Sequence, residues 1–313
     1  MIKYDRMATT ITATAFCALL TGLAFAAPAA RSFASPQQAV DALVSALRGG
    51  DEPALEGILG PDGEAILHSG DRADDMVRQK KFLAAYDAHA ELVPKDANHV
   101  TIEVGNDKWP LPIPVVRVGG GWQFDAKAGA HEILARRIGE NELDAIQSCL
   151  AYVDAQRDYA SVDRGDHVLD YARRFVSTEG KTDGLYWPTK PGQPQSPLGP
   201  AFAEAREQGY IFDGPRASDA PVPYHGYYFK ILEGQGPNAK GGAYGYVVNG
   251  KMIGGFALVA SPAMYRISGV TTFIVNQDGT VFQKDLGPQT PAIVQKMTVF
   301  DPGKGWTPVS NAS

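Results

Sequence analysis

The spacing of hydrophobic residues indicates helices near the start of the chain. In residues 35–51, apolar side chains recur every three or four positions, which places them on one face of a helix. Ser35 is a suitable N-cap, and Pro36 fits the first helical turn. Gly49 and Gly50 then end the helix. Similar patterns predict two further helices, over residues 52–60 and 71–90.

Alternating apolar and polar residues predict antiparallel strands after these helices. The expected strands are 99–106, 109–118 and 120–127. A run of three glycines, 119–121, supplies the turn between the last two. Pro110, Pro112 and Pro114 each lack a backbone donor, so their segment is either an edge strand or an extended cover.

A second group of helices and strands is predicted from residue 138 onward. Asn141 is expected to cap a helix that continues to residue 163. Its expected apolar face comprises Leu143, Ile146, Leu150 and Val153. The pattern then predicts a helix over 166–177, a Pro- and Gly-rich loop over 183–200 and a short helix over 201–210.

Strands dominate the end of the chain. The expected strand segments are 225–232, 242–262 and 269–287, followed by a helix over 290–297. Within 242–262 the turn falls at Asn249-Gly250 or at Gly254-Gly255, and Asn-Gly is the stronger hairpin signal. Thr290 is expected to cap the closing helix.

Together these patterns predict an α+β protein in two parts. Each part combines helices with an antiparallel sheet, and 34 glycines and 22 prolines imply many turns. The expected organisation is a signal peptide at 1–26, an N-terminal domain at 35–137, a C-terminal domain at 138–300 and a tail at 301–313.

The first residues predict export. Lys3 and Arg6 precede an apolar, uncharged run, and Ala24 and Ala26, on either side of Phe25, fit the A-x-A site that a signal peptidase reads. Because the run is close to the length of a membrane span, an uncleaved anchor is the alternative. Cleavage near Ala26 would leave the protein periplasmic or secreted, without stable membrane insertion.

Charge and cysteine content narrow the possible partners. The net charge is −6, and cleavage would remove two basic residues and one acidic residue, giving −7. An acidic chain with scattered basic residues does not suit nucleic acid or an anionic membrane. Only Cys149 would remain, so no internal disulfide is expected, and its place in an amphipathic helix predicts a small core residue.

Two resemblances concern the fold of each part. Helices followed by a meander ending in "GGGWQFD", over about residues 35–137, resemble the nuclear-transport-factor-2-like fold, which often encloses a pocket. The C-terminal part resembles the globular heads of type IV pilins and pseudopilins. That likeness rests on the ordered positions Gly255, Phe256, Ala260, Pro262, Gly269, Phe273, Asn276 and Gly279. The prepilin leader is missing, so at most the head fold is implied.

Longer phrases point to one family. "SPQQAVDALVSALRGGD", "WPLPIPVV", "AYVDAQRDYA", "DGLYWP", "YHGYYFKIL" and "VVNGKMIGGFALVA" are together long and specific. On these phrases the chain is identified as a member of an exported bacterial family, domain of unknown function 2950. Membership implies secretion and no particular chemistry.

An aromatic group supplies the candidate ligand-binding residues. Tyrosines and a tryptophan near Pro- and Gly-rich loops can line a groove for sugars or peptides. The candidates are Tyr186, Trp187, His225 and Tyr227. The alternative is a sheet covered on both faces. Strand alternation then puts His225 at the start of the more apolar row, bonded to backbone.

Metal and cofactor motifs are incomplete. "HEILA" begins like a zinc-protease helix, but Ala135 stands where the second histidine belongs. Asp163, Asp166 and Asp170 fail the EF-hand spacing and leave only a loose calcium site, against a turn that caps a helix. No cofactor is expected, because no phosphate-binding glycine motif appears.

Two functions remain open at this level. The first is a non-enzymatic cell-envelope module that binds an envelope protein or glycan through the aromatic face or the loop 183–200. The second is an enzyme or small-ligand binder with a pocket in the N-terminal domain. For the second, the nearest acid–base candidates are Asp107, Asp125 and His131.

Overall fold

The structure is a computed structural model of the chain. It describes residues 30–165, 167–190, 192–208, 210 and 222–310. The expected signal peptide lies outside these residues. Among the described residues, no helix combines the length and the apolar character needed to cross a membrane.

The first half of the chain folds as four helices and a small antiparallel sheet. The helices are α1 (Pro36–Gly49), α2 (Glu52–Leu59), α3 (Glu64–Leu67) and α4 (Arg72–Ala88), with a 3₁₀ turn at Pro61–Gly63. The strands are β1 (Ala90–Pro94), β2 (His99–Val104), β3 (Trp109–Pro110), β4 (Val115–Val118) and β5 (Gly121–Phe124). Strand order is β1-β2-β4-β5, and β3 pairs with β2.

Local signals explain most of this half. Ser35 Oγ accepts a hydrogen bond from the Gln38 amide, and Gly50 ends α1 with a φ of 61°. Asp71 caps α4 by accepting from the amides of Ala73 and Asp74. The pattern missed β1, which pairs along its whole length with β2. The core of this half includes Val40, Val44, Leu55, Ile102 and Val115.

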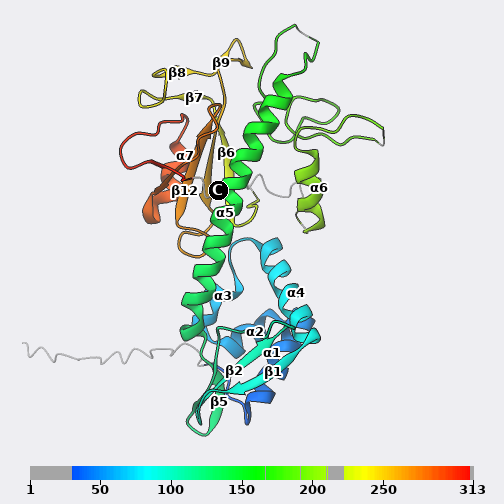
Figure 1. The fold of residues 1–313 in the computed structure, drawn as a ribbon, viewed down its shortest axis with the longest axis vertical. Coiled ribbons are helices and arrows are strands. Elements are labelled where there is room, and N and C mark those ends of the chain that lie inside the picture. The colour runs from blue at the N-terminus through cyan, green and yellow to red at the C-terminus, as the bar shows by residue number, and fades with distance from the viewer. Residues whose placement is uncertain (1–29, 166, 191, 209, 211–221, 311–313) are drawn as a thin grey trace, which may run out of the picture.

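Helix α5 (Ala126–Ala160) has 35 residues and joins the two halves. In Figure 1 it rises from the cyan sheet below, past the yellow-to-red strands above. The prediction that Asn141 caps a helix is wrong, because Asp125 caps α5 and Asn141 is buried in its middle. The expected boundary at residues 137 and 138 therefore falls within α5.

The buried face of α5 also differs from the expected apolar stripe. Leu143 is 63% exposed, whereas Ala145 and Cys149 are almost completely buried. Small residues here allow the helix to approach the strands of the second half closely, so helix spacing and packing override side-chain hydrophobicity. Cys149 is a buried core residue, as predicted.

The second half is built on a five-stranded antiparallel sheet. Its strand order is β14-β13-β12-β11-β6. These strands are β6 (Tyr227–Leu232), β11 (Ala257–Pro262), β12 (Thr271–Asn276), β13 (Phe282–Asp285) and β14 (Thr307–Pro308). The short strands are β7 (Gly234–Gln235), β8 (Tyr244–Gly245), β9 (Val247–Val248) and β10 (Lys251–Met252). The helices are α6 (Gly199–Glu207) and α7 (Thr290–Lys296).

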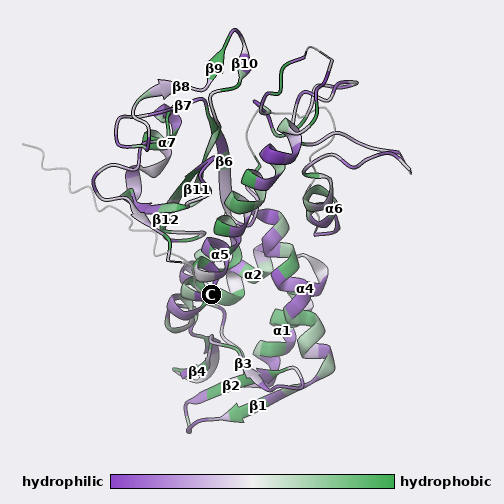
Figure 2. Ribbon diagram, turned by 45° about the horizontal axis from the view of Figure 1, so that its top comes forward, coloured by the Kyte–Doolittle hydropathy of each residue, from purple (hydrophilic) through white to green (hydrophobic). Residues whose placement is uncertain are grey.

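The sheet is the centre of a second hydrophobic core. All six residues of β11 are buried, and α5 packs against β11 and β12. Figure 2 shows hydrophobic stretches in both halves of the molecule, including these central strands. The buried hydrophobic residues of the described chain thus form two separate clusters, one in each half.

Two turns at Gly residues follow the prediction. Asn249 and Gly250, with φ of 49° and 83°, form the two-residue turn between β9 and β10. The turn at 277–279 joins β12 to the segment before β13. Thr290 lies inside α7, and the N-cap is Gln289, one residue earlier than expected.

The helix predicted over 166–177 is wrong. In the part that the structure describes, Tyr171 donates its amide to Met252 O, and Ser177 donates its amide to Tyr186 O. These bonds to other segments of the chain use backbone groups that a helix would have paired internally. The apolar residues of this segment therefore pack as extended chain, which short apolar runs do not distinguish from helix.

Candidate functional site

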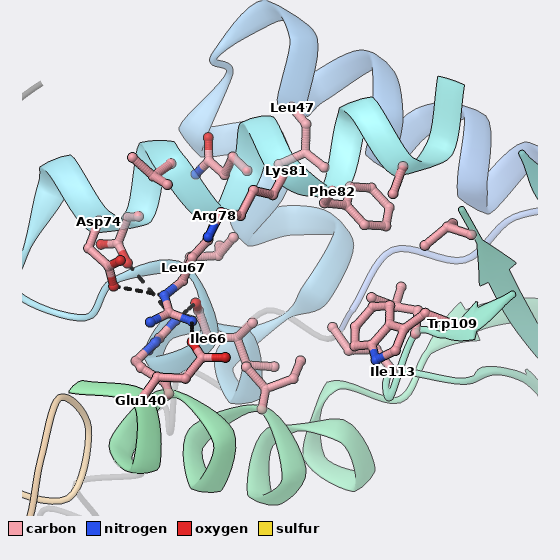
Figure 3. Close-up of a pocket in the computed structure, with 18 of the residues that line it drawn as sticks. Leu47, Ile66, Leu67, Asp74, Arg78, Lys81, Phe82, Trp109, Ile113 and Glu140 are labelled. Carbon is pink, nitrogen blue, oxygen red and sulfur yellow. Dashed lines mark hydrogen bonds and ion pairs between the residues drawn. The ribbon is translucent and has the colours of Figure 1, made fainter. Parts of the chain in front are cut away.

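A cleft of about 540 Å³ lies between α4 and α5. Its volume is in the range of small-ligand sites in proteins. Figure 3 shows α4 on one side, α5 on the other, and the region of β3 at one end. Helices α4 and α5 are held apart here, because side chains of α1, α3 and the sheet line the space between them.

One end of the cleft is apolar. Figure 3 shows Phe82 facing Trp109 and Ile113 across this end. Other apolar side chains that line the cleft are Leu47, Ile66 and Leu67. The apolar side chains at this end also pack against the first core, and they offer a surface for a hydrocarbon or an aromatic ring.

The other end is charged, and helical spacing explains how. On α5, Arg137, Glu140 and Asp144 recur at three- and four-residue intervals, which puts them on one face. On α4, Asp74 and Arg78 are four residues apart and also share a face. The two charged faces meet at the cleft.

Arg78 bridges the two helices. Its Nε donates to Asp74 Oδ2 at 2.7 Å, and its two terminal nitrogens donate to Glu140 Oε2 at 2.6 Å and to Asn141 Oδ1 at 3.2 Å. Figure 3 draws the Asp74 and Glu140 interactions. Burial alone would lower the pKa of Arg78, but the two carboxylates outweigh it and raise the pKa. Arg78 therefore stays protonated, and the carboxylates of Asp74 and Glu140 balance its charge.

Asp75 and Arg137 form a second, looser contact across the cleft. The terminal nitrogens of Arg137 donate to the carbonyls of Ala65 and Ile66, and Arg137 is 3% exposed. Asp75 Oδ1 lies 3.9 Å from Arg137 Nη2. Neither Asp75 Oδ1 nor Arg137 Nε has a hydrogen-bond partner in the described chain. Burial raises the pKa of Asp75, despite the Ser69 hydrogen bonds and Arg137.

His225 lines the cleft beside Asp144. Its Nδ1 lies 3.1 Å from Asp144 Oδ2, and its ring meets Tyr224 edge-on at 4.2 Å. The prediction that His225 begins a strand is wrong, because its φ is 47° and β6 starts at Tyr227. The expected bond from the imidazole to backbone is replaced by the pairing with Asp144, and the backbone amide of His225 donates to Tyr210 Oη at 3.0 Å.

A buried hydrogen-bond network connects the segment around His225 to α4. Asp71 is 1% exposed and accepts from Tyr210 Oη at 2.7 Å and from the Gly226 amide at 2.9 Å. Burial, and then the charge of Asp71, raise the pKa of Tyr210, so its phenol remains a donor. The N-cap of α4 thereby anchors the segment that carries His225.

The four candidate ligand residues do not gather in one groove. Only His225 lines the cleft. Tyr186 is buried and stacks on Phe202 at 4.2 Å, and Trp187 lies near the Arg164 guanidinium. Tyr227 is completely buried in the second core.

The three acid–base candidates also separate. Asp125 caps α5 by accepting from the Ala128 amide at 3.0 Å. His131 is exposed on α5, and Asp107 lines the cleft. The pattern does not single out the polar stripe of Arg137, Glu140 and Asp144, because a polar face on a helix is usually solvated.

The acidic loop has a structural role. Asp163 Oδ1 accepts from the amides of Gly165 and His167, as in a turn. Asp166 lies outside the described residues, and Asp170 follows in extended chain. Among the described residues, no group of three His, Cys, Asp or Glu side chains is placed to hold a metal ion.

The sequence profile of the family described as "Protein of unknown function (DUF2950)" matches residues 30–309. The chain belongs to this family. No curated protein and no solved structure matches this DUF2950 chain. The resemblances to nuclear transport factor 2 and to pilin heads therefore stay predictions.

Proposed function

We propose that this protein is exported and binds a small amphiphilic molecule in the cleft between α4 and α5. The observation that carries the proposal is the separation of the cleft into an apolar end and a charged end. Such a surface matches a ligand with an apolar body and one polar group. The charged beginning, apolar run and small residues of 1–26 support export.

The envelope module that binds through aromatic residues has less support. Tyr186 and Tyr227 are 5% and 0% exposed, so neither offers its ring to a partner. A protein or glycan partner in the envelope is still compatible with the cleft, provided that a small part of that partner enters it.

Filling the apolar end tests the proposal. Ala85 lines the cleft, whereas Ala84 is exposed on the same helix. In a thermal-shift screen of C8 amphiphiles, the protein without residues 1–26 should be stabilised by at least one compound. Ala85→Trp should weaken binding by at least about tenfold, and Ala84→Trp should not. Equal binding by both variants contradicts the proposal.

The pairing of His225 with Asp144 favours acid–base catalysis as a second candidate. The carboxylate at 3.1 Å orients the imidazole, so Nε2 is left to exchange a proton in the cleft. An ester of octanoic acid provides a direct test. His225→Gln should abolish any hydrolysis, while His131→Gln, on the exposed face of α5, should retain it. Hydrolysis that survives in His225→Gln excludes this role.

A further inference from the structure

We propose that the polar group of the ligand is a cation, such as the ammonium of an amine with an apolar tail. The inference rests on the proposed function, because it concerns the same cleft. The charges of the cleft wall and the unused hydrogen-bonding atoms of that wall support it independently of each other.

The wall carries more acidic than basic side chains. The acidic residues that line the cleft are Asp74, Asp75, Asp107, Glu140 and Asp144. The basic residues that line it are Arg78, Lys81 and Arg137. Five carboxylates against three cations leave a net charge of −2 with His225 neutral. A cleft with walls of low dielectric concentrates this field, which attracts cations and repels anions.

Two of the three basic side chains of the wall are already engaged, and the third, Lys81, is exposed on α4. Arg78 is held between two carboxylates, and Arg137 donates to two backbone carbonyls and faces Asp75. Arg78 would have to give up a present partner to bind an anionic group, and Arg137 has only its Nε to offer. An anionic group would also lie close to the carboxylates of Glu140 and Asp144, which would repel it.

The unused atoms are mostly acceptors. Within the described residues, Glu140 accepts from Arg78 through Oε2, and Asp144 meets His225 through Oδ2, which leaves Glu140 Oε1 and Asp144 Oδ1 for a ligand. Two buried oxygens of the lining residues, Asp75 Oδ1 and Gln208 Oε1, have no donor there. Against these stands one buried donor, Arg137 Nε. Because an unpaired buried acceptor is unfavourable, a ligand with several N–H groups suits this wall best.

The two ends of the cleft set the orientation of the ligand. The tail would pack between Phe82 and Trp109, and the ammonium would lie toward Glu140 and Asp144. A primary amine is charged at neutral pH, because its pKa is near that of lysine, about 10.4. It offers three donors to the carboxylate oxygens.

The test compares octylamine, octanol and octanoate by isothermal titration calorimetry. Octylamine should bind most tightly and octanoate least, and only the octylamine affinity should fall as salt is raised. Asp144→Asn and Glu140→Gln should each weaken octylamine about threefold to tenfold and leave octanol unchanged. Glu132→Gln is the matched control, because Glu132 is exposed on α5 and does not line the cleft.

The outcomes separate the two proposals. Octanol binding as tightly as octylamine, with no effect of Asp144→Asn or Glu140→Gln, overturns the cation inference and leaves the cleft as a ligand site. The proposed function itself is overturned if none of the three compounds binds. It is also overturned if Ala85→Trp leaves their affinity unchanged. Two carboxylate variants are used so that a folding defect in one does not decide the result.

Discussion

Asp71 is the residue whose removal most directly tests how the two halves are held together. It caps α4 and also accepts from Tyr210 Oη and from the Gly226 amide, which lie 139 and 155 residues away. Asp71→Ala removes the cap, worth about 1 kcal/mol. It also leaves two donors without their acceptor, at about 1 to 3 kcal/mol each. We expect a loss of about 3 to 7 kcal/mol.

Asp51 provides the matched control. It caps α2 by accepting from the Ala54 amide and is exposed. Asp51→Ala removes a cap of the same chemistry without breaking a contact between the halves, so we expect a loss of about 1 kcal/mol. The difference between the two variants therefore measures the long-range bonds of Asp71.

The assay is urea unfolding followed by fluorescence and circular dichroism. Both probes are needed, because two halves on one helix need not unfold in a single step. Tyr210→Phe completes a double-mutant cycle with Asp71→Ala, and we expect a coupling of about 1 to 2 kcal/mol. If Asp71→Ala and Asp51→Ala lose the same free energy, the bonds to Tyr210 and Gly226 contribute nothing and the reasoning is refuted.

Three further predictions concern single positions. Gly226 has a φ of 70°, and an added Cβ would lie 2.4 Å from Asn141 Nδ2. Gly250 has a φ of 83°, but an added Cβ there would meet open space. Gly226→Ala should therefore lower the melting temperature by more than Gly250→Ala, and equal melting temperatures would contradict this. Burial raises the pKa of Cys149 to about 12, so a thiol reagent at pH 8 should label it only after unfolding. Because the folded-state pKa of Asp75 is raised, its favourable contribution to stability exists below the ordinary value of 3.8 and is lost as pH rises. The free energy of unfolding of Asp75→Asn should therefore rise relative to that of the wild type as pH increases. A relative free energy that falls over the same pH range would contradict this.

Much of the fold could be predicted because its signals are local. The cap at Ser35, the Asn249-Gly250 turn and the period of α1 each involve residues a few positions apart. The errors arose where distant partners decide. The pattern predicts a cap at Asn141, but the side-chain amide of Asn141 donates to Ser268 O, 127 residues away, and the helix continues through this position.

The candidate site was less predictable than the fold. His225 was singled out from its aromatic surroundings, but its carboxylate partner, Asp144, lies on another element. Arg78 and Glu140 are 62 residues apart, and no motif connects them. A polar stripe on a helix is usually a solvated face, so the pattern alone does not reveal that this stripe faces a cleft.

The sequence by itself determined the family, the α+β class, most of the helices and hairpins, and the burial of Cys149. Capping, turn chemistry and hydrophobic period act within a few residues, and they do not depend on the rest of the chain. Only the tertiary structure decided that α5 runs unbroken between two cores and that α4 stands away from it. Arg78 and Asp75 on α4 meet Glu140 and Arg137 on α5 across that gap, and these contacts join residues that are 62 positions apart in the sequence.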